Sequence, residues 1–539
     1  MKIKIRLSLL GMMITLILFV LSCTIKEEIP DKYTQSVLTS DPNLLINFLS
    51  PPLAQLRTLW WRQDFWGMQE ATSDELFFPT RATDWQDGFV WQQDYLLTWS
   101  PTHRDVIGTW NSSNTGISAS NTALANLKVE SADDPGYIKA YRGQAKFLRT
   151  FYEYCLYDLF RKFPYRDAFS TNFLIPAKIF EGEAGFYHMV TIAKEQLPFI
   201  TTREDAYYGQ PNKDADLMLL AKLYLNKEIY TGIAGYDSCL IYLDELINSN
   251  HYGLADNYFK MFDVNNDVRY KTADDEAIFV AVNDDGDNYG NDDNVIWARP
   301  TLHYNQELSG HQYYPKQGTF WNGCACPTGS IVDTWFAGTD IQKDVRWCDS
   351  SYIKTMSIPA GHLMGQQYDL NKTPTQDRGG KLLNFTVKCD LIPSDSIEMR
   401  GVRVMKYMVK AIPINIHRTP NDFIIWRYAD VLLMKAECLA RANNDVAGAL
   451  TIVNEIRTKR NAPLITASSK SEILDKILIE RGLELYWEGH RRQDMIRFGT
   501  FLLPKTSKPT TSDATKILLP IPAAAISGSS GTLSQNPGY

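Results

Sequence analysis

The stretch WRYADVLLMKAE, residues 426–437, lies within a longer run, residues 424–442, whose pattern decides the fold class. In that run, apolar and small residues recur every three or four positions, at Ile425, Tyr428, Ala429, Leu432, Leu433, Ala436, Leu439 and Ala440. This spacing places them on one face of an α-helix. Alanines on that face let a second helix approach closely. The run therefore predicts a helix that packs tightly against a helical neighbour.

The same periodicity recurs along the chain. It predicts further helices over residues 137–163, 214–230, 236–248, 446–460 and 471–498. Pro164 ends the first of these, and a turn at residues 232–235 separates the next two. Paired helices with small residues at their contact are typical of tetratricopeptide-like hairpins, in which neighbouring hairpins bury what one hairpin cannot.

The region of residues 251–420 differs from this helical scaffold. It is rich in Asp, Asn, Gly, Pro and aromatic residues and has only weak periodicity, so we predict loops with short strands. The expected architecture is one mostly α-helical domain over residues 41–539, with helical repeats at about 41–250 and 421–500. Residues 251–420 form a loop-rich insert, and loops on a rigid scaffold are where binding groups usually lie.

The N-terminus resembles a secretory leader. Lys2, Lys4 and Arg6 precede an uncharged apolar run over residues 7–21, which is too short for a confident membrane span. A small residue and Cys23 follow where cleavage is expected, as in a bacterial lipobox. We therefore predict a signal peptide at residues 1–22, lipidation of Cys23 and a polar tether at 23–40. A plain signal peptide that happens to contain Cys23 is the less favoured alternative.

Composition narrows the class of partner. The chain has the composition of an ordinary globular protein, with 12% aromatic residues that include 13 Trp and 28 Tyr. Such residues favour binding surfaces because each has an apolar face and a polar tip. The formal net charge is −7, and loss of the three cationic leader residues makes it −10. A negative protein repels polyanions, so nucleic acid is not expected as a partner.

Seven cysteines remain after Cys23, and an odd number cannot all pair. Three of them lie in apolar helical patterns and are predicted to be buried thiols: Cys155, Cys239 and Cys438. The other four lie in loop-like sequence and could form a bridge outside the cell: Cys324, Cys326, Cys348 and Cys389. Zinc is not expected, because Cys-x-Cys lacks the usual spacing and no histidine pair lies nearby.

The stretch PTRATDWQDGFVWQQDYLLTW, residues 79–99, mixes three tryptophans with charged residues and glycine. A core element would place such large rings on one face, whereas a recognition surface presents flat rings beside polar groups. The stretch alone leaves both readings open.

Three C-terminal segments closely resemble the SusD/RagB family of Bacteroidetes outer-membrane lipoproteins. They are residues 426–437, residues 480–499 (ERGLELYWEGHRRQDMIRFG) and residues 535–539 (QNPGY). The pattern Pro-Thr-Arg-x-x-Asp-Trp with the later Thr98-Trp99 is similar to a segment that glycan-binding members place at their sugar site. This chain has Ala82 where glycine is expected. Residues 26–28 (KEE) resemble the signal that sends such lipoproteins to the outer face of the outer membrane.

The resemblance implies four tetratricopeptide-like units and a loop-rich half that faces the ligand. It also implies a partner, a SusC-like TonB-dependent barrel to which the protein delivers captured nutrients. Oligosaccharides are the commonest cargo of the family, and some members carry peptides. On this basis we expect a lipid-anchored receptor at the outer membrane that faces the cell exterior.

Site residues follow from the same resemblance. Arg81 and Asp84 are expected to bond sugar hydroxyls, and Trp85 and Trp99 to stack on the apolar faces of sugar rings. Trp91 is predicted to belong to the core, and core packing stays an alternative for each of the other tryptophans. The insert is expected to complete the site with two further aromatic residues, Tyr289 and Trp321.

No cofactor, metal or catalytic residue is expected. The acidic runs at residues 263–267 and 283–294 do not fit the EF-hand template, which leaves solvated turns or an irregular calcium site. His490 and its charged neighbours have the spacing of ordinary helical pairing. The adjacent Asp74 and Glu75 do not set a glycosidase separation. A surface glycoside hydrolase, a peptide receptor and a repeat scaffold without a ligand are the rival functions.

Overall fold

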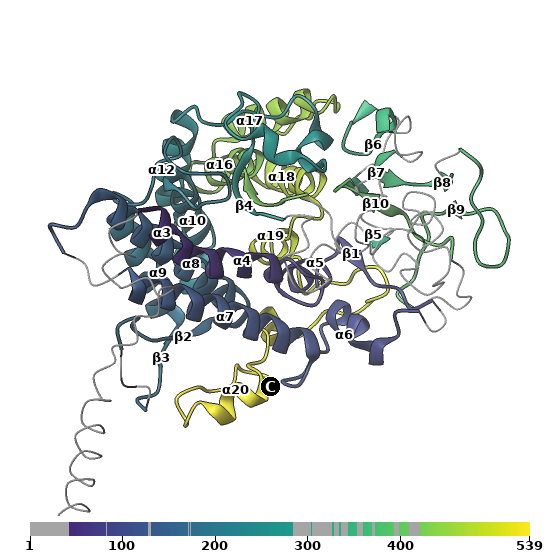
Figure 1. Ribbon diagram of the computed structural model, residues 1–539. Coiled ribbons are helices and arrows are strands. Elements are labelled where there is room, and N and C mark those ends of the chain that lie inside the picture. Colours follow the sequence, from purple (N-terminus) through teal and green to yellow (C-terminus); the bar gives the residue numbers. More distant parts are fainter. Residues whose placement is uncertain are drawn as a thin grey trace, which may run out of the picture. The chain divides into compact units, whose positions relative to one another are not determined.

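The structure is a computed structural model of the 539-residue chain (Figure 1). It describes residues 42–81, 84–127, 131–170, 172, 174–283, 303, 326–327, 334–335, 343–352, 359–368, 372–392, 398–408 and 421–539. Two compact units are distinguished, Met1–Leu45 and Ile46–Tyr539. The described part of the first unit is helix α3 (Pro42–Leu45). Among the described residues, none of the helices has the length and apolar character needed to cross a membrane.

The second unit is mainly helical, as predicted (Figure 1). Its α-helices are α4 (Ser50–Leu59), α5 (Phe65–Glu70), α6 (Val90–Leu96), α7 (Arg104–Asn126), α8 (Gly136–Phe160), α9 (Gly182–Gln196), α10 (Lys213–Leu225), α11 (Lys227–Thr231), α12 (Tyr236–Asn248), α16 (Tyr428–Asn443), α17 (Val446–Lys459), α18 (Lys470–Leu485), α19 (Arg491–Arg497) and α20 (Ala523–Gly528). Short 3-10 turns include η3 (Asp87–Phe89) and η4 (Tyr258–Phe262).

The strands are short and pair in small antiparallel sheets. They are β1 (Leu76–Phe77), β2 (Lys162–Tyr165), β3 (Lys178–Glu181), β4 (Ala277–Ala281), β5 (Cys326–Pro327), β6 (Cys348–Asp349), β7 (Ala360–Leu363), β8 (Gly365–Gln366), β9 (Asn384–Phe385), β10 (Arg403–Met405) and β11 (Phe423–Arg427). The order β10-β7-β6 forms one sheet, and the other pairs are β1-β5, β11-β4, β2-β3 and β8-β9. Most of these strands lie in the predicted insert, which confirms its content.

The insert leaves and rejoins the helical scaffold at one ribbon. Strand β4 lies near the start of the insert, and β11 comes directly after the end of the insert. The two strands pair, with Ala281 opposite Phe423 and Ala277 opposite Arg427. Both strands are almost wholly buried. The ribbon therefore fixes both ends of the insert against the helices.

The helical hairpins pack through the small residues seen in the sequence. Helices α7 and α8, α10 and α12, and α16 and α17 are contacting pairs. One core cluster joins α16, α17 and α18 through Leu432, Leu433, Ala436, Ala440, Ala449, Val453, Ile456, Ile473, Ile477 and Leu485. Side chains cap the starts of helices in the scaffold: Asn212 is the N-cap residue of α10, and Ser469 is the N-cap residue of α18. The tetratricopeptide-like packing is confirmed.

One predicted helix begins later than expected, and a second is divided inside. Residues 423–427 form β11, and α16 begins only at Tyr428. The sequence FIIWR is buried at every position, so alternation gives no sign of the strand. The helix predicted over residues 214–230 is divided at Asn226: α10 ends at Leu225, and α11 begins at Lys227.

The helix predicted over residues 471–498 is interrupted. Helix α18 ends at Leu485, and α19 begins at Arg491. Between them Trp487 and Gly489 adopt left-handed backbone conformations, with φ of 70° and 81°. The N–H groups of Trp487 and Gly489 donate to the carboxylates of Glu75 and Glu70 rather than to a helical turn. A tertiary contact thus breaks a periodic pattern.

Buried ion pairs join the insert to the scaffold. Arg427 Nε lies 2.8 Å from Glu488, and Arg427 Nη1 lies 2.8 Å from Glu484. From the insert, Lys406 Nζ lies 2.6 Å from Glu488, and Arg346 Nη1 lies 2.6 Å from Glu480. All of these side chains are at most 1% exposed. Such pairs leave no charge uncompensated and fix the register between the two regions.

The prediction of three buried thiols is confirmed, whereas the two loop cysteines whose side chains are described form no bridge. Cys155, Cys239 and Cys438 are buried free thiols in the helical core. Cys389 is also buried and free, and Cys348 is partly buried and free. Cys324 lies outside the described residues, so a bridge from it stays a prediction.

Candidate ligand-binding site

The segment of residues 76–99 lies along the insert. Strand β1 pairs with β5, with Leu76 opposite Pro327. Beyond the strand, the Thr80 N–H donates to the Leu391 carbonyl at 3.0 Å. The chain then passes through η3 into α6, on the same side of the molecule as β1 (Figure 1). The segment is therefore placed where scaffold and insert meet.

Arg81 does not face solvent. Its side chain is fully buried, and Nη2 donates to the Arg400 carbonyl at 2.7 Å. Its backbone pairs in both directions with Asp84, at 3.1 and 2.9 Å. The expectation that Arg81 bonds a ligand hydroxyl is not supported, because its guanidinium cross-links the segment to the insert instead.

Trp99 is likewise a packing residue. Its side chain is 2% exposed, and its indole N–H donates to the Tyr539 hydroxyl at 2.6 Å. The Tyr539 hydroxyl in turn donates to the Leu518 carbonyl at 2.8 Å. A ring sealed in this way offers no face to a sugar, so the platform expected at Trp99 is replaced by an anchor for the C-terminus.

Trp91 belongs to the core, as predicted. Its side chain is fully buried and stacks on Phe78 with ring centroids 4.4 Å apart. Its indole N–H donates to Asp87 at 2.7 Å, and the guanidinium of Arg104 lies 4.5 Å from the ring.

Of the predicted site residues that the structure describes, Trp85 and Asp84 keep contact with solvent, and both are partly buried. Trp85 leans on the core, with its ring 5.9 Å from Phe78 and 5.7 Å from Trp91. Its backbone is left-handed, with φ of 60°. Asp87, Gly88 and Phe89 follow in the same region of φ. Non-glycine residues seldom adopt it, and such strain gathers at ligand sites.

A chain of charges begins at Asp84 and runs into the insert. Arg378 contacts both Asp84 and Glu398, and His303 Nε2 lies 2.9 Å from Glu398. Burial opposes ionisation of Glu398, but hydrogen bonds from His303 and Arg378 hold its pKa at about 2. Burial lowers the pKa of His303. A carboxylate and a guanidinium from the insert are thus fixed next to Asp84, which precedes Trp85 in the chain.

This arrangement offers a partly buried ring, Trp85, whose neighbour Asp84 is paired with a charged group of the insert. Sequence reasoning missed Arg378, Glu398 and His303, because Arg378 stands 294 positions from Asp84 in a region without periodicity. Tyr289 and Trp321 lie outside the described residues and stay predictions. Asp263, in one of the two acidic runs, is paired with Lys260 at 2.7 Å.

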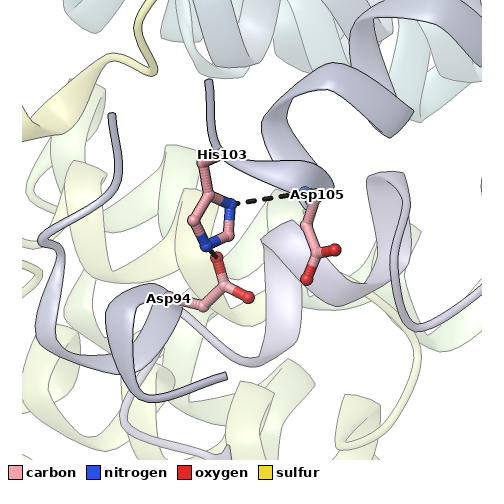
Figure 2. A group of neighbouring side chains, drawn as sticks. All are labelled: Asp94, His103 and Asp105. Atoms are coloured by element: carbon pink, nitrogen blue, oxygen red, sulfur yellow. Dashed lines mark hydrogen bonds and ion pairs between the residues drawn. The ribbon is translucent and has the colours of Figure 1, made fainter. Parts of the chain in front are cut away.

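Close to this segment, Asp94, His103 and Asp105 form a buried cluster (Figure 2). One donor atom from each lies within 4.8 Å of the others, which raises the question of a metal. His103 caps α7: its Nδ1 accepts from the Asp105 N–H at 3.3 Å. The proton of a neutral imidazole must then be on Nε2, which faces the Val90 carbonyl at 3.3 Å.

A metal does not fit these donors. Binding at Nε2 would move the proton to Nδ1, where it would oppose the Asp105 N–H. Asp105 is also already held by Arg104 Nε at 2.6 Å. Burial raises the pKa of Asp94 well above its usual range, and the neighbouring Asp105 raises it further. The cluster is better described as a buried acid, Asp94, beside the residues that cap α7.

The group around His490 belongs to the scaffold, as predicted, but its helical pairing differs from the prediction, because Glu488 and His490 precede α19. Burial lowers the pKa of His490 to about 3, so the imidazole is neutral. Arg481 Nε lies 2.7 Å from Asp494, and Glu488 is bound by Arg427. Asp74 is paired with Arg491 at 2.7 Å.

Comparison with known proteins shows which family the chain resembles. Residues 275–515 match the SusD family. The chain is also 24% identical to the starch-binding protein SusD of Bacteroides thetaiotaomicron over 84% of its own length and 82% of that protein. The chain is thus similar to SusD proteins over most of its length.

Solved structures of SusD-like proteins share the fold. A SusD superfamily protein from Parabacteroides distasonis superposes with a TM-score of 0.70 at 18% identity, over 94% of this chain and all of that one. Surface glycan-binding protein A from Bacteroides thetaiotaomicron, solved with laminarihexaose, superposes with a TM-score of 0.63 at 20% identity, over 91% of this chain and 99% of that one.

Proposed function

We propose that this protein belongs to the SusD family and is a lipid-anchored receptor on the cell surface that binds oligosaccharides and delivers them to a SusC-like TonB-dependent transporter. The observation that carries the proposal is its similarity, over 84% of the chain, to a starch-binding protein. The shared fold with a glycan-binding protein solved with laminarihexaose is consistent with it.

The chemistry of the candidate site supports sugar as the ligand. Stacking on the exposed part of Trp85 would remove the apolar C–H face of a sugar ring from water. Asp84 and Arg378 supply an acceptor and several donors for the hydroxyl rim. A single ring gives modest affinity, which suits capture followed by release.

Binding is tested by titration calorimetry of the mature protein against a panel of oligosaccharides. We expect at least one to bind, and Trp85→Ala to weaken that binding roughly tenfold, because one aromatic platform is worth about 1 kcal/mol beyond the area it buries. Arg378→Met should weaken it by a similar factor.

A matched control is Tyr187→Ala. Tyr187 is a 43% exposed aromatic residue on α9, which Figure 1 shows on the opposite side from β1 and α6. Its removal should leave affinity unchanged. Sugar binding retained in both Trp85→Ala and Arg378→Met would remove the site assignment, while binding to no glycan at all would remove the function.

The same samples separate the rival functions. Reducing ends released over time would show a glycoside hydrolase, whereas the proposal predicts binding without product. Titration with peptides in place of glycans would reveal a peptide receptor. Binding of neither class would favour a repeat scaffold without a small ligand.

Location and partner are tested in cells. Wild-type protein should label with a fatty-acid probe and be accessible to an impermeant reagent on intact cells, and Cys23→Ser should do neither. Affinity purification from outer membranes should recover a TonB-dependent barrel. Recovery of the protein alone would contradict the proposed partnership.

A further inference from the structure

Three tyrosines lie together at the surface near the start of α8. Tyr137 and Tyr141 are one helical turn apart on α8 and partly buried, with ring centroids 6.4 Å apart and ring planes inclined by 60°. Tyr207 comes from the turn between α9 and α10 and is 69% exposed. Burial raises the pKa of Tyr141, and the nearby Tyr207 and Tyr137 raise it further. We call these three residues the tyrosine patch.

The tyrosine patch is distinct from the site around Trp85. It lies on the first two turns of α8, a helix of 25 residues whose ends are about 36 Å apart. The last residue of α8, Phe160, packs on Trp110 near the start of α7, with ring centroids 5.0 Å apart. Arg104, the first residue of α7, contacts the ring of Trp91, which neighbours Trp85. In Figure 1, α9 and α10 lie on the opposite side from β1 and α6.

The turn that carries Tyr207 is held on both sides, although the ring itself faces solvent. The carbonyl group that precedes Tyr207 accepts from the Tyr270 hydroxyl at 3.1 Å. After the ring, the Tyr208 hydroxyl donates to Asp422 at 2.6 Å. Within the turn, the Tyr207 N–H donates to the Gln210 side chain at 3.2 Å, and the Gln210 N–H donates to the Tyr207 carbonyl at 3.1 Å. A turn held in this way loses little conformational entropy when a ligand binds to its ring.

The polar groups of the tyrosine patch are not used inside the protein. Buried tyrosines of the scaffold bond their hydroxyls internally: Tyr152 donates to a carbonyl of α4, and Tyr230 donates to a carboxylate of α8. Within the part of the chain that the structure describes, the three hydroxyls of the tyrosine patch have no such partner. The Gln210 side chain accepts the Tyr207 N–H through its oxygen, so its amide group adds donors beside the ring. The surface therefore combines apolar ring faces with hydroxyl and amide groups.

A carbohydrate fits this surface better than a protein partner does. A stable protein interface buries about 800 Å² on each partner, which is more than three rings supply when two of them are partly buried. A sugar ring needs only one aromatic face for its apolar C–H groups and a few polar groups for its hydroxyls. Because the rings of Tyr137 and Tyr141 are inclined to each other, successive units of a twisted sugar chain can stack on different rings.

We propose that Tyr137, Tyr141 and Tyr207 form a second carbohydrate-binding surface, which contacts polysaccharide chains that extend beyond the site around Trp85. This inference rests on the proposed function, because it takes sugar as the ligand class. Two weak contacts with one chain act together. The tyrosine patch therefore raises affinity for long chains and leaves affinity for short oligosaccharides unchanged.

Affinity electrophoresis of the mature protein tests this with a panel of soluble polysaccharides that includes starch and laminarin. For a polysaccharide that retards the wild type, the double variant Tyr141→Ala/Tyr207→Ala should raise the dissociation constant about tenfold, because two stacking rings are lost. Calorimetry with the hexasaccharide of the same polysaccharide should give equal affinities for the wild type and the double variant. Trp85→Ala should weaken the binding of both lengths of sugar.

Matched variants assign the effect to the rings. Tyr141→Phe/Tyr207→Phe keeps both rings and should keep most of the affinity, and Tyr187→Ala, an exposed tyrosine of α9 outside the tyrosine patch, should match the wild type. If the double alanine variant does not fold by circular dichroism, Tyr207→Ala alone decides, with an expected loss of about threefold.

The outcomes separate this inference from the proposed function. Polysaccharide binding that is as tight in the double alanine variant as in the wild type overturns the second surface and leaves the proposed function standing. A wild-type protein that binds no polysaccharide and no oligosaccharide overturns both.

Discussion

Glu484 in the scaffold and Glu75 next to the segment of residues 76–99 are both buried glutamates, yet burial has different outcomes for them: the pKa of Glu484 is lowered and the pKa of Glu75 is raised. Burial opposes ionisation of Glu484, but Arg460, Arg427 and Arg346 hold its pKa well below the usual range. Glu75 is buried beside another acid, Glu70, and its pKa is raised. Neighbours, and not residue type or burial, decide whether a buried acid is charged.

The difference has a structural meaning. The buried carboxylates of Glu484, Glu488 and Glu276 are each paired with arginine. Glu70 and Glu75, which directly precede the segment of residues 76–99, are both buried, and burial raises the pKa of both. Buried acids of one protein thus differ in charge from region to region.

The largest effect is expected from breaking the scaffold network. Arg427→Met removes a cation that Glu484, Glu488 and Glu276 share, so that these three carboxylates keep Arg460, Arg346 and Lys406 as cationic partners. We expect the free energy of unfolding to fall by about 3–5 kcal/mol, because an uncompensated buried charge remains. Urea denaturation measures this. A loss below about 1 kcal/mol would show that the network does not hold the scaffold together.

A somewhat smaller effect is expected at Trp99. If this residue anchors the C-terminus, Trp99→Ala should destabilise the protein by about 3 kcal/mol. Trp85→Ala, which removes a partly buried ring, should lower the free energy of unfolding clearly less. Thermal unfolding compares the two variants directly. Equal losses would mean that the two rings have the same role, against the burial seen here.

The pH dependence of stability sharpens the contrast. Arg497 and Arg441 overcome burial and hold the pKa of Glu437 at about 2. Its contribution, about 3 kcal/mol, is present above pH 4.5 and is lost as pH falls towards 2. In Glu437→Gln the free energy of unfolding should therefore depend less on pH below about 4.5. In Glu70→Gln it should depend less on pH between about 4.5 and 7 instead. An unchanged pH dependence below 4.5 in Glu437→Gln would contradict the claim that Glu437 is ionised in the folded protein.

The smallest effect is expected at the surface. Lys459 pairs with Asp256, whose side chain is 79% exposed. Lys459→Met should change the free energy of unfolding by less than about 1 kcal/mol, since water screens the pair. Urea denaturation in parallel with Arg427→Met tests whether burial sets the size of the effect. A comparable loss in both variants would argue against it.

The sequence predicted the long helices well, because their apolar spacing is a local property. Helix α12 has the predicted ends, and α8 ends within three residues of them. The strand at residues 423–427 was missed, since a segment buried on all sides shows no alternation. The break after Leu485 was missed because its cause, Glu70 and Glu75, lies more than 400 positions away.

The candidate site was predicted only in part for a similar reason. A motif identifies a segment but does not say which of its rings face water. Trp85 and Trp99 stand fourteen positions apart in one motif, yet only Trp85 keeps contact with solvent. The charged partner of Asp84 comes from the insert, where the sequence has no periodic signal to follow.

A crystal structure of the mature protein with a bound oligosaccharide tests the central claim most directly. The account predicts a sugar ring stacked on the exposed face of Trp85, with its hydroxyls hydrogen-bonded to Asp84 and Arg378. A sugar bound at another surface, with Trp85 untouched, would contradict it.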